Sequence, residues 1–202
     1  MIAVLDYGIG NLRSAEKALQ RVGGDAALTA DIGAIERADA LVLPGVGAFG
    51  RCMEALRATG LEKPALTAIE EGKPFLGICI GMQMLYEGSE EDPSIAGMDV
   101  LTGKVRRLPD GVKRPQMQWN LLSGSTDSPM FAGFTPPVWV YFVHSFAPVT
   151  DEHVVATCEY GGSVVAAVQR DYLWATQFHP EKSGPPGLKL LENFVAATRR
   201  AA

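Results

Sequence analysis

A chain of 202 residues, of which 47% are hydrophobic and 20% charged, has the size and composition of one globular domain, predicted to span residues 1–202. Its net charge of −5 and pI of about 5.2 argue against a nucleic-acid-binding or anionic-membrane-binding surface. No apolar run approaches membrane-spanning length, no leader is visible, and the cysteines at 52, 79 and 158 are too far apart for a disulfide framework or a zinc site. The sequence therefore predicts a cytoplasmic protein.

The first half of the chain alternates short apolar runs with segments of helical spacing. Strands are predicted at residues 2–6, 25–30 and 40–43, and in the run that ends at Cys79. Helices are predicted at residues 12–22, 49–58 and 64–71. This alternation predicts an α/β fold with a mainly parallel central sheet and helices on both faces. In such sheets, binding sites gather at the carboxyl ends of the strands.

Two glycine-rich loops follow predicted strands, at Tyr7-Gly-Ile-Gly-Asn11 and Pro44-Gly-Val-Gly47. The first lacks the full dinucleotide-binding fingerprint, and the second lacks the Lys-Ser/Thr of a phosphate-binding loop. The backbone of the second loop can instead form an oxyanion hole or cradle a substrate, although simple turn chemistry also explains its glycines. No cofactor and no metal are expected.

The stretch Gly77-Ile-Cys79-Ile-Gly81 has the spacing of a nucleophile elbow, a sharp turn between a strand and a helix. Glycines two residues before and after the nucleophile let the chain and the helix pass close to each other. A cysteine at the start of a helix is favoured as the thiolate. A buried cysteine in a glycine-rich turn is the structural alternative, and the stretch alone does not separate the two.

The second half of the chain contains shorter strand-like runs, at residues 98–108, 138–149, 153–160 and 163–169, which predict added antiparallel strands. A strand at 173–178 and an amphipathic helix at 185–202 close the domain. The acidic run Ser89-Glu-Glu-Asp-Pro93 is predicted as a loop, which is either simply solvated or holds a cationic group of a substrate.

His179 and Glu181 lie two residues apart at the end of the strand at 173–178, so their side chains project from the same face. In this arrangement a carboxylate can orient an imidazole, which can in turn activate a thiol. Cys79, His179 and Glu181 therefore form a candidate nucleophile–base–orienter triad. His-Pro-Glu alone is more typical of a surface turn, but together with the elbow it favours catalysis.

The two stretches Gly77-Ile-Cys-Ile-Gly-Met-Gln83 and Gln177-Phe-His-Pro-Glu-Lys-Ser183 together resemble the class I (triad-type) glutamine amidotransferases. Within that class, four further stretches are similar to the glutaminase subunits of imidazole glycerol phosphate synthases: Asp6-Tyr-Gly-Ile-Gly-Asn-Leu12, Pro44-Gly-Val-Gly47, Trp119-Asn120 and Tyr141-Phe-Val-His-Ser145. The resemblance implies a flavodoxin-like amidotransferase fold. In it Cys79 attacks the amide of L-glutamine, His179 carries the proton to the departing ammonia, and Glu181 holds the imidazole.

The resemblance also implies the remaining roles. The oxyanion would meet the backbone N–H of Ile80 and an N–H of the Pro44–Gly47 loop, at Val46 or Gly47. Glutamine would be recognised around Gly47, Gln83, Glu91, Ser145 and Phe146, and a carboxylate at Glu91 suits the α-ammonium group. The implied partner is a (β/α)8-barrel cyclase subunit, which uses the ammonia in histidine biosynthesis and faces Asn11, Met117, Trp119, Asn120, Tyr141 and Lys182.

Three alternatives remain open: a triad glutaminase that serves another synthase, a cysteine peptidase or related hydrolase on a similar fold, and a non-catalytic binding subunit. The chain also departs from the family pattern at Gln118, because a glycine commonly precedes Trp-Asn there. If that glycine supports a positive φ, we expect Gln118 to strain or reshape the loop.

Overall fold

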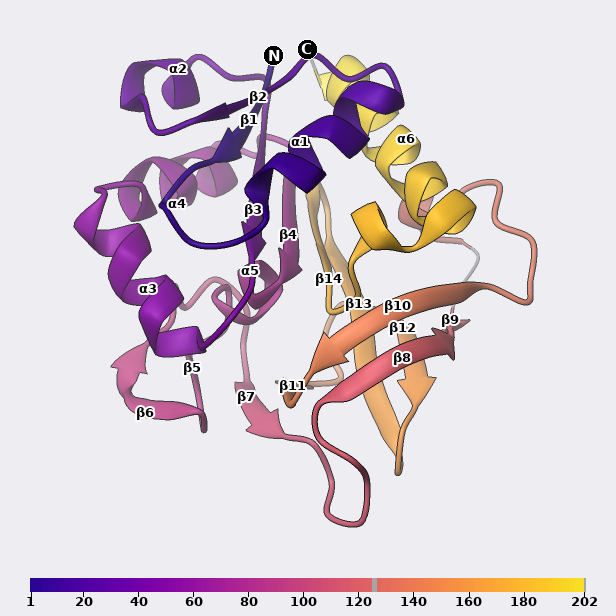
Figure 1. Ribbon diagram of the computed structural model, residues 1–202. Coiled ribbons are helices and arrows are strands. Elements are labelled where there is room, and N and C mark those ends of the chain that lie inside the picture. Colours follow the sequence, from indigo (N-terminus) through magenta and orange to yellow (C-terminus); the bar gives the residue numbers. More distant parts are fainter. Residues whose placement is uncertain (125–126, 202) are drawn as a thin grey trace.

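The computed structural model describes residues 1–124 and 127–201. An eight-stranded sheet of order β2-β1-β3-β4-β14-β13-β12-β9 runs through the molecule (Figure 1). Its parallel part consists of β1 (Ile2–Leu5), β2 (Ala26–Thr29), β3 (Ala40–Gly45), β4 (Phe75–Cys79) and β14 (Leu173–Thr176). Its antiparallel part adds β13 (Ser163–Arg170), β12 (Val154–Glu159) and β9 (Ser123–Gly124). The predicted fold, mainly parallel with antiparallel strands from the second half, is confirmed.

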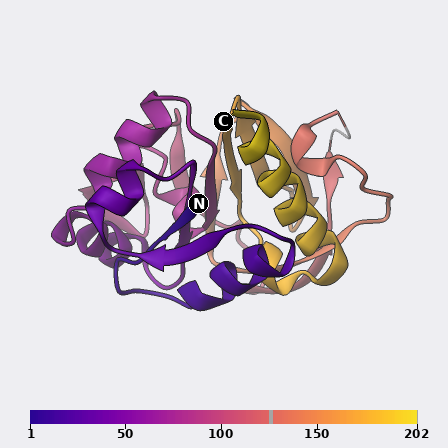
Figure 2. The same cartoon turned by 90° about the horizontal axis from the view of Figure 1, so that it is seen from above.

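Helices cover both faces of this sheet. On one face α1 (Leu12–Arg21) packs beside α6 (Gly184–Ala201), and the other carries α2 (Ile32–Glu36), α3 (Phe49–Ala58) and α4 (Glu62–Glu70) (Figures 1 and 2). Every residue of β1, β3, β4 and β14 is buried. Strands that are covered on both faces read as continuous apolar runs, which is why these four were visible in the sequence.

Two smaller sheets lie beside the large one. One pairs β8 (Gln116–Leu121) with β10 (Trp139–His144), and the other joins β11 (Phe146–Val149), β7 (Lys104–Arg107), β5 (Gly88–Ser89) and β6 (Asp92–Ala96). The run at 138–149, predicted as one strand, is interrupted at Ser145 because β10 and β11 pair in different sheets. The acidic run predicted as a loop is a hairpin, in which β5 and β6 flank Glu90 and Glu91.

The strain expected at Gln118 is not present in the described part of the chain. Gln118 continues β8 opposite Phe142, and the non-glycine residues with positive φ are Cys79, Asp99, His153 and Asp171. Short 3-10 helices form at η1 (Pro129–Phe131) and η2 (Pro180–Lys182). Within the described residues, no helix has the length and apolar character needed to cross a membrane.

Candidate active site

Cys79 ends β4 and directly precedes α5 (Ile80–Gln83), with φ 55° and ψ −109°, a strained conformation for a residue that has a side chain. Gly81 makes this turn possible, because a Cβ there would lie 1.8 Å from the carbonyl oxygen of Leu43. At Gly77 a Cβ would lie 3.0 Å from the carbonyl oxygen of Gly81. The turn that the glycine spacing predicts is therefore present, and close backbone packing requires a glycine at position 81 and leaves little room for a side chain at position 77.

The helix that follows Cys79 is a single turn of 4 residues. A helix of that length carries little macrodipole, since the dipole is the sum of many aligned peptide units. The helix dipole therefore matters less for Cys79 than the sequence suggested, and the groups around its sulfur matter more.

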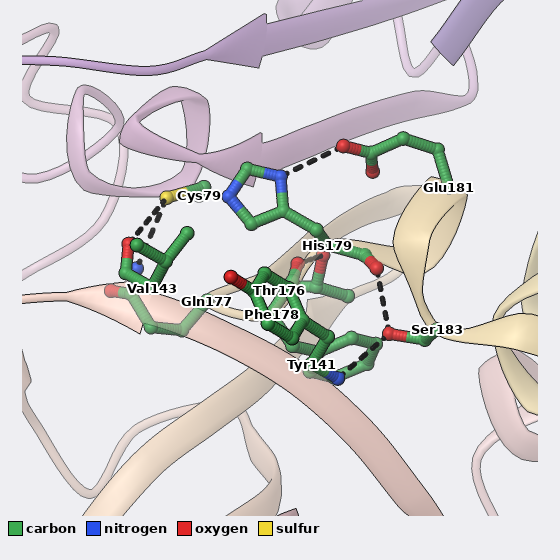
Figure 3. Close-up of polar contacts among 9 residues, drawn as sticks. All are labelled: Cys79, Tyr141, Val143, Thr176, Gln177, Phe178, His179, Glu181 and Ser183. Carbon is green, nitrogen blue, oxygen red and sulfur yellow. Dashed lines mark hydrogen bonds and ion pairs between the residues drawn. The ribbon is translucent and has the colours of Figure 1, made fainter. Parts of the chain in front are cut away.

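His179 lies just after β14, which runs parallel to β4 and pairs Thr176 with Ile78, so the ends of the two strands meet. The Nδ1 atom of His179 lies 2.8 Å from Oε1 of Glu181, and these side chains are only 1% and 6% exposed. The Nε2 atom has no hydrogen-bond partner among the described residues, and it points toward the sulfur of Cys79 (Figure 3). Nucleophile, base and orienter are thus adjacent and buried.

Two histidines near this site have opposite pKa shifts. Burial lowers the pKa of His179, but the Cys79 sulfur and the Glu181 carboxylate together outweigh burial and raise it from 6.5 to about 9. Burial also lowers the pKa of His144, and there it prevails over the hydrogen bond to the Phe146 carbonyl, so that the pKa falls to about 4. His179 is therefore favoured as a cation and can supply a proton, whereas His144 stays neutral.

A cavity of about 250 Å³ lies over the sulfur of Cys79. Its lining brings together the predicted nucleophile and base, the predicted oxyanion residues and the predicted glutamine-binding residues: Val46, Gly47, Cys79, Ile80, Gln83, Glu91, Ser145, Phe146 and His179. Glu181 does not line the cavity and contacts His179 from behind. Small-molecule pockets commonly hold about 300–1,000 Å³, so this volume suits a ligand of amino-acid size.

Glu91 is the only carboxylate among the described residues that line the cavity. Its Oε2 accepts a hydrogen bond of 2.8 Å from the backbone N–H of Phe49, the first residue of α3, which fixes the side chain. Gly47 has φ 102°, and a Cβ there would meet nothing within 4 Å, so bare backbone borders the open space. The cavity therefore offers a fixed negative charge to a cationic group of a ligand.

The residues predicted to face a partner lie outside the cavity: Asn11, Met117, Trp119, Asn120, Tyr141 and Lys182. Met117 and Trp119 on β8 are 62% and 48% exposed. The ring of Trp119 meets that of Tyr141 on β10 edge to face, with centroids 6.2 Å apart. The side chain of Asn120 instead donates to the carbonyl oxygen of Glu159 at 2.9 Å.

Sequence reasoning did not single out Gln177 or Cys52 as part of the site. Gln177 donates a hydrogen bond from Nε2 to Sγ of Cys79 at 3.7 Å, and its position two residues before His179 was the available signal. Cys52 is fully buried, and its Sγ donates to the carbonyl oxygen of Val46 at 3.5 Å. The described residues contain no group of three or more His, Cys, Asp or Glu side chains that could hold a metal ion.

Known proteins resemble this chain over nearly its whole length. Residues 3–198 match the family of class-I glutamine amidotransferases. The chain is 49% identical to the imidazole glycerol phosphate synthase subunit HisH of Methanothermobacter thermautotrophicus, covering 98% of this chain and 100% of that relative. It is 45% identical to the subunit of the same name from Syntrophotalea carbinolica, covering 96% and 98% of the two chains.

Solved structures share the fold. A crystal structure of a glutamine amidotransferase superposes with a TM-score of 0.73 at 25% identity, covering 96% of this chain and 98% of that one. A chain in the structure of PurLQS from Thermotoga maritima superposes with a TM-score of 0.78 at 22% identity, covering 97% of each chain, which supports the fold alone. The chain therefore belongs to the class-I glutamine amidotransferase family, as its motifs predicted.

Proposed function

We propose that this chain is the glutaminase subunit of an imidazole glycerol phosphate synthase, which hydrolyses L-glutamine and passes the ammonia to a cyclase subunit in histidine biosynthesis. The 49% identity to a HisH subunit over its full length is the observation that carries the proposal. The strained Cys79 beside the buried His179–Glu181 pair supplies the chemistry that such a subunit needs.

In the first half-reaction the thiolate of Cys79 attacks the side-chain amide carbon of glutamine, and an electron pair moves onto the carbonyl oxygen. Backbone N–H groups at Ile80 and at Val46 or Gly47 stabilise the resulting oxyanion. The Nε2 atom of His179 gives its proton to the amide nitrogen. The C–N bond then breaks, leaving ammonia and a thioester.

In the second half-reaction His179 takes a proton from water, and the resulting hydroxide attacks the thioester. The C–S bond breaks, glutamate leaves, and the thiolate of Cys79 is restored beside protonated His179. Throughout, Glu181 holds the imidazole so that Nε2 faces the sulfur. The carboxylate of Glu91 pairs with the α-ammonium group of glutamine, which explains an acidic side chain in the cavity.

The product requires a partner. Ammonia becomes protonated in neutral water and is then no longer a nucleophile, so it must be released against the subunit that uses it. We take this partner to be a (β/α)8-barrel cyclase that docks on the exposed side chains of β8 and β10, with Trp119 as an anchor. A cytoplasmic setting belongs to the same proposal, because the cytosol keeps free thiols such as Cys52, Cys79 and Cys158 reduced.

The decisive experiment measures glutamate formation by the protein alone, with the cyclase, and with the cyclase and its phosphoribosyl nucleotide substrate. We expect slow hydrolysis by the protein alone and strong stimulation by the substrate-loaded cyclase. Cys79→Ala should abolish hydrolysis, while its complex with the cyclase still forms product from supplied ammonium.

Two results would contradict the proposal. The loaded cyclase could leave the glutaminase rate unchanged, which would favour an amidotransferase of another synthase. Alternatively, the protein could cleave peptides and leave glutamine intact, which would favour a cysteine peptidase.

A further inference from the structure

We infer that the buried amide of Gln177 is a positioning residue that holds the sulfur of Cys79 in its reactive form. Gln177 is 0% exposed, and its Nε2 donates to Sγ of Cys79 at 3.7 Å (Figure 3). Its Oε1 accepts a hydrogen bond of 3.0 Å from Nε2 of Gln83. The inference deepens the proposed function and rests on it, because it concerns the nucleophile of that reaction.

A backbone carbonyl fixes which way both amides face. The carbonyl oxygen of Phe146 can only accept hydrogen bonds, and it lies 2.9 Å from Nε2 of Gln83. Gln83 must therefore present its NH2 group to this oxygen, and the second hydrogen of the same group meets Gln177. Gln177 must therefore accept this hydrogen bond with its Oε1 atom, so its own NH2 group points toward Cys79. Reversing either amide would bring two donors or two acceptors together, which is costly in a buried site.

The sulfur of Cys79 therefore faces a donor whose orientation is set by Gln83 and the Phe146 carbonyl and does not depend on the sulfur itself. A thiolate accepts a hydrogen bond more strongly than a thiol does, so this N–H favours the nucleophilic form. The carbonyl oxygen of Val143 lies 4.0 Å from the same sulfur, and because it can only accept a hydrogen bond it favours the thiol. Gln177 offsets that preference.

Gln177 also differs from His179 in what it can do during a reaction cycle. His179 gives up its proton to the departing ammonia, so its charge is not constant. The amide of Gln177 cannot titrate and remains a donor in every step. It therefore stabilises the thiolate when Cys79 is released from the thioester, at the moment when the imidazole has just regained its proton.

The test compares Gln177→Glu and Gln177→Met with Gln116→Met. Glutamate is isosteric with glutamine and sets a carboxylate oxygen against the sulfur, whereas methionine keeps the volume and removes the donor. Gln116 is the matched control, because it is equally buried and also donates to a cysteine sulfur, that of Cys158 at 3.9 Å. The measurement is the rate at which iodoacetamide alkylates Cys79 at pH 7 and at pH 9.5, followed by mass spectrometry of its peptide.

At pH 7 we expect alkylation of Cys79 to slow about tenfold in Gln177→Met, because the hydrogen bond to the charged sulfur is lost. Alkylation should slow further in Gln177→Glu, because a carboxylate there repels the thiolate. At pH 9.5 the rates of the variants should approach the wild-type rate, which a mere change in access to the sulfur would not produce. Gln177→Met leaves in place every titratable group around the sulfur: His179, His144, Glu91, Tyr7 and Cys52. Gln177→Glu adds one carboxylate to this set. Gln116→Met removes the hydrogen bond of 3.0 Å between Oε1 of Gln116 and Nε2 of His144, so it also controls for a change at that histidine.

The inference is overturned if Gln177→Glu is alkylated at the wild-type rate at pH 7, or if Gln116→Met slows the reaction as much. Alkylation needs neither glutamine nor the cyclase, so the two proposals fail separately. If alkylation changes as expected and no cyclase stimulates the glutaminase, the role of Gln177 stands and the proposed function falls.

Discussion

Strands β4 and β14 are parallel neighbours whose ends carry the two reacting side chains, yet they position them by different means. β4 ends in a strained residue, Cys79, held by backbone packed so closely that Gly81 tolerates no Cβ. β14 is followed by His179 in an ordinary extended conformation, φ −98° and ψ 98°. That imidazole is held instead by a side-chain hydrogen bond to Glu181.

The comparison shows two ways of fixing the position of a reacting side chain. The nucleophile must not move, and backbone packing fixes it at a cost in conformational strain. The base must accept and release a proton, so it is held by groups that respond to its charge. Substitutions of the glycines that support Cys79 should therefore act on stability, and substitutions after β14 should act on catalysis and proton affinity.

The largest effect is expected from Gly81→Ala. The added Cβ would lie 1.8 Å from the Leu43 carbonyl oxygen, so we expect a loss of more than about 4 kcal/mol in the free energy of unfolding, or no folded protein. Gly72→Ala is the control, because Gly72 has φ +74° and nothing within 4 Å of its Cβ position, and should cost about 1 kcal/mol. Urea unfolding followed by circular dichroism measures the stability of both variants. Equal losses of stability would show that the approach of the Leu43 carbonyl oxygen does not require glycine at position 81.

A large effect on rate is expected from Glu181→Gln. The amide loses the charge that stabilises the imidazolium, so kcat for glutamine hydrolysis with the cyclase should fall about 100-fold while KM changes little. Glu192→Gln is the control, since Glu192 pairs with Lys189 on the surface. Steady-state kinetics distinguish the two, and an unchanged kcat in Glu181→Gln would exclude the orienting role.

The two histidines allow a test within one sample. NMR titration should give His179 a pKa of about 9 and His144 a pKa of about 4. In Cys79→Ala the pKa of His179 should fall, because a group that raises it is gone, while that of His144 serves as the internal reference. Since the folded-state pKa of His179 exceeds 6.5, its contribution to stability is present below pH 6.5 and is lost as the pH rises through 9. If the pKa of His179 stays the same in Cys79→Ala, the sulfur of Cys79 does not raise the pKa of this imidazole.

The smallest effect compares two ways of removing the thiol. Glycine adopts φ 55° without a Cβ penalty, so Cys79→Gly should be more stable to urea than Cys79→Ala by about 1–2 kcal/mol. At Cys158, an ordinary residue of β12, the glycine variant should instead be the less stable one. If alanine were also the more stable choice at Cys79, the backbone would not be strained there.

The sequence predicted the end of β4 well because the glycine spacing that marks the turn lies within five consecutive residues, Gly77 to Gly81, although the contact with Leu43 that requires Gly81 does not. It predicted the His179–Glu181 pair for the same reason, since both residues follow one strand. It did not reveal the contact of Gln177 with Cys79, because the orientation of that amide depends on Gln83 and on a backbone oxygen of β11, all distant along the chain.

Short elements were the other limit. α2 has only 5 residues, too few for a helical period to be recognised, although Asp31 caps it by accepting from the N–H of Ala34. β10 and β11 follow each other almost without a gap, and alternation within a run cannot say that its two halves pair with different strands.

The packing of Gly81 against Leu43 limits how this protein could be redesigned. Leu43 lies directly before Pro44–Gly47, so the backbone that supports the nucleophile also leads into the loop beneath the cavity. A mutant library that widens the loop for another amide would shift Cys79 at the same time. Changes of substrate are better sought at Ser145 and Phe146, which also line the cavity but come from a separate part of the chain.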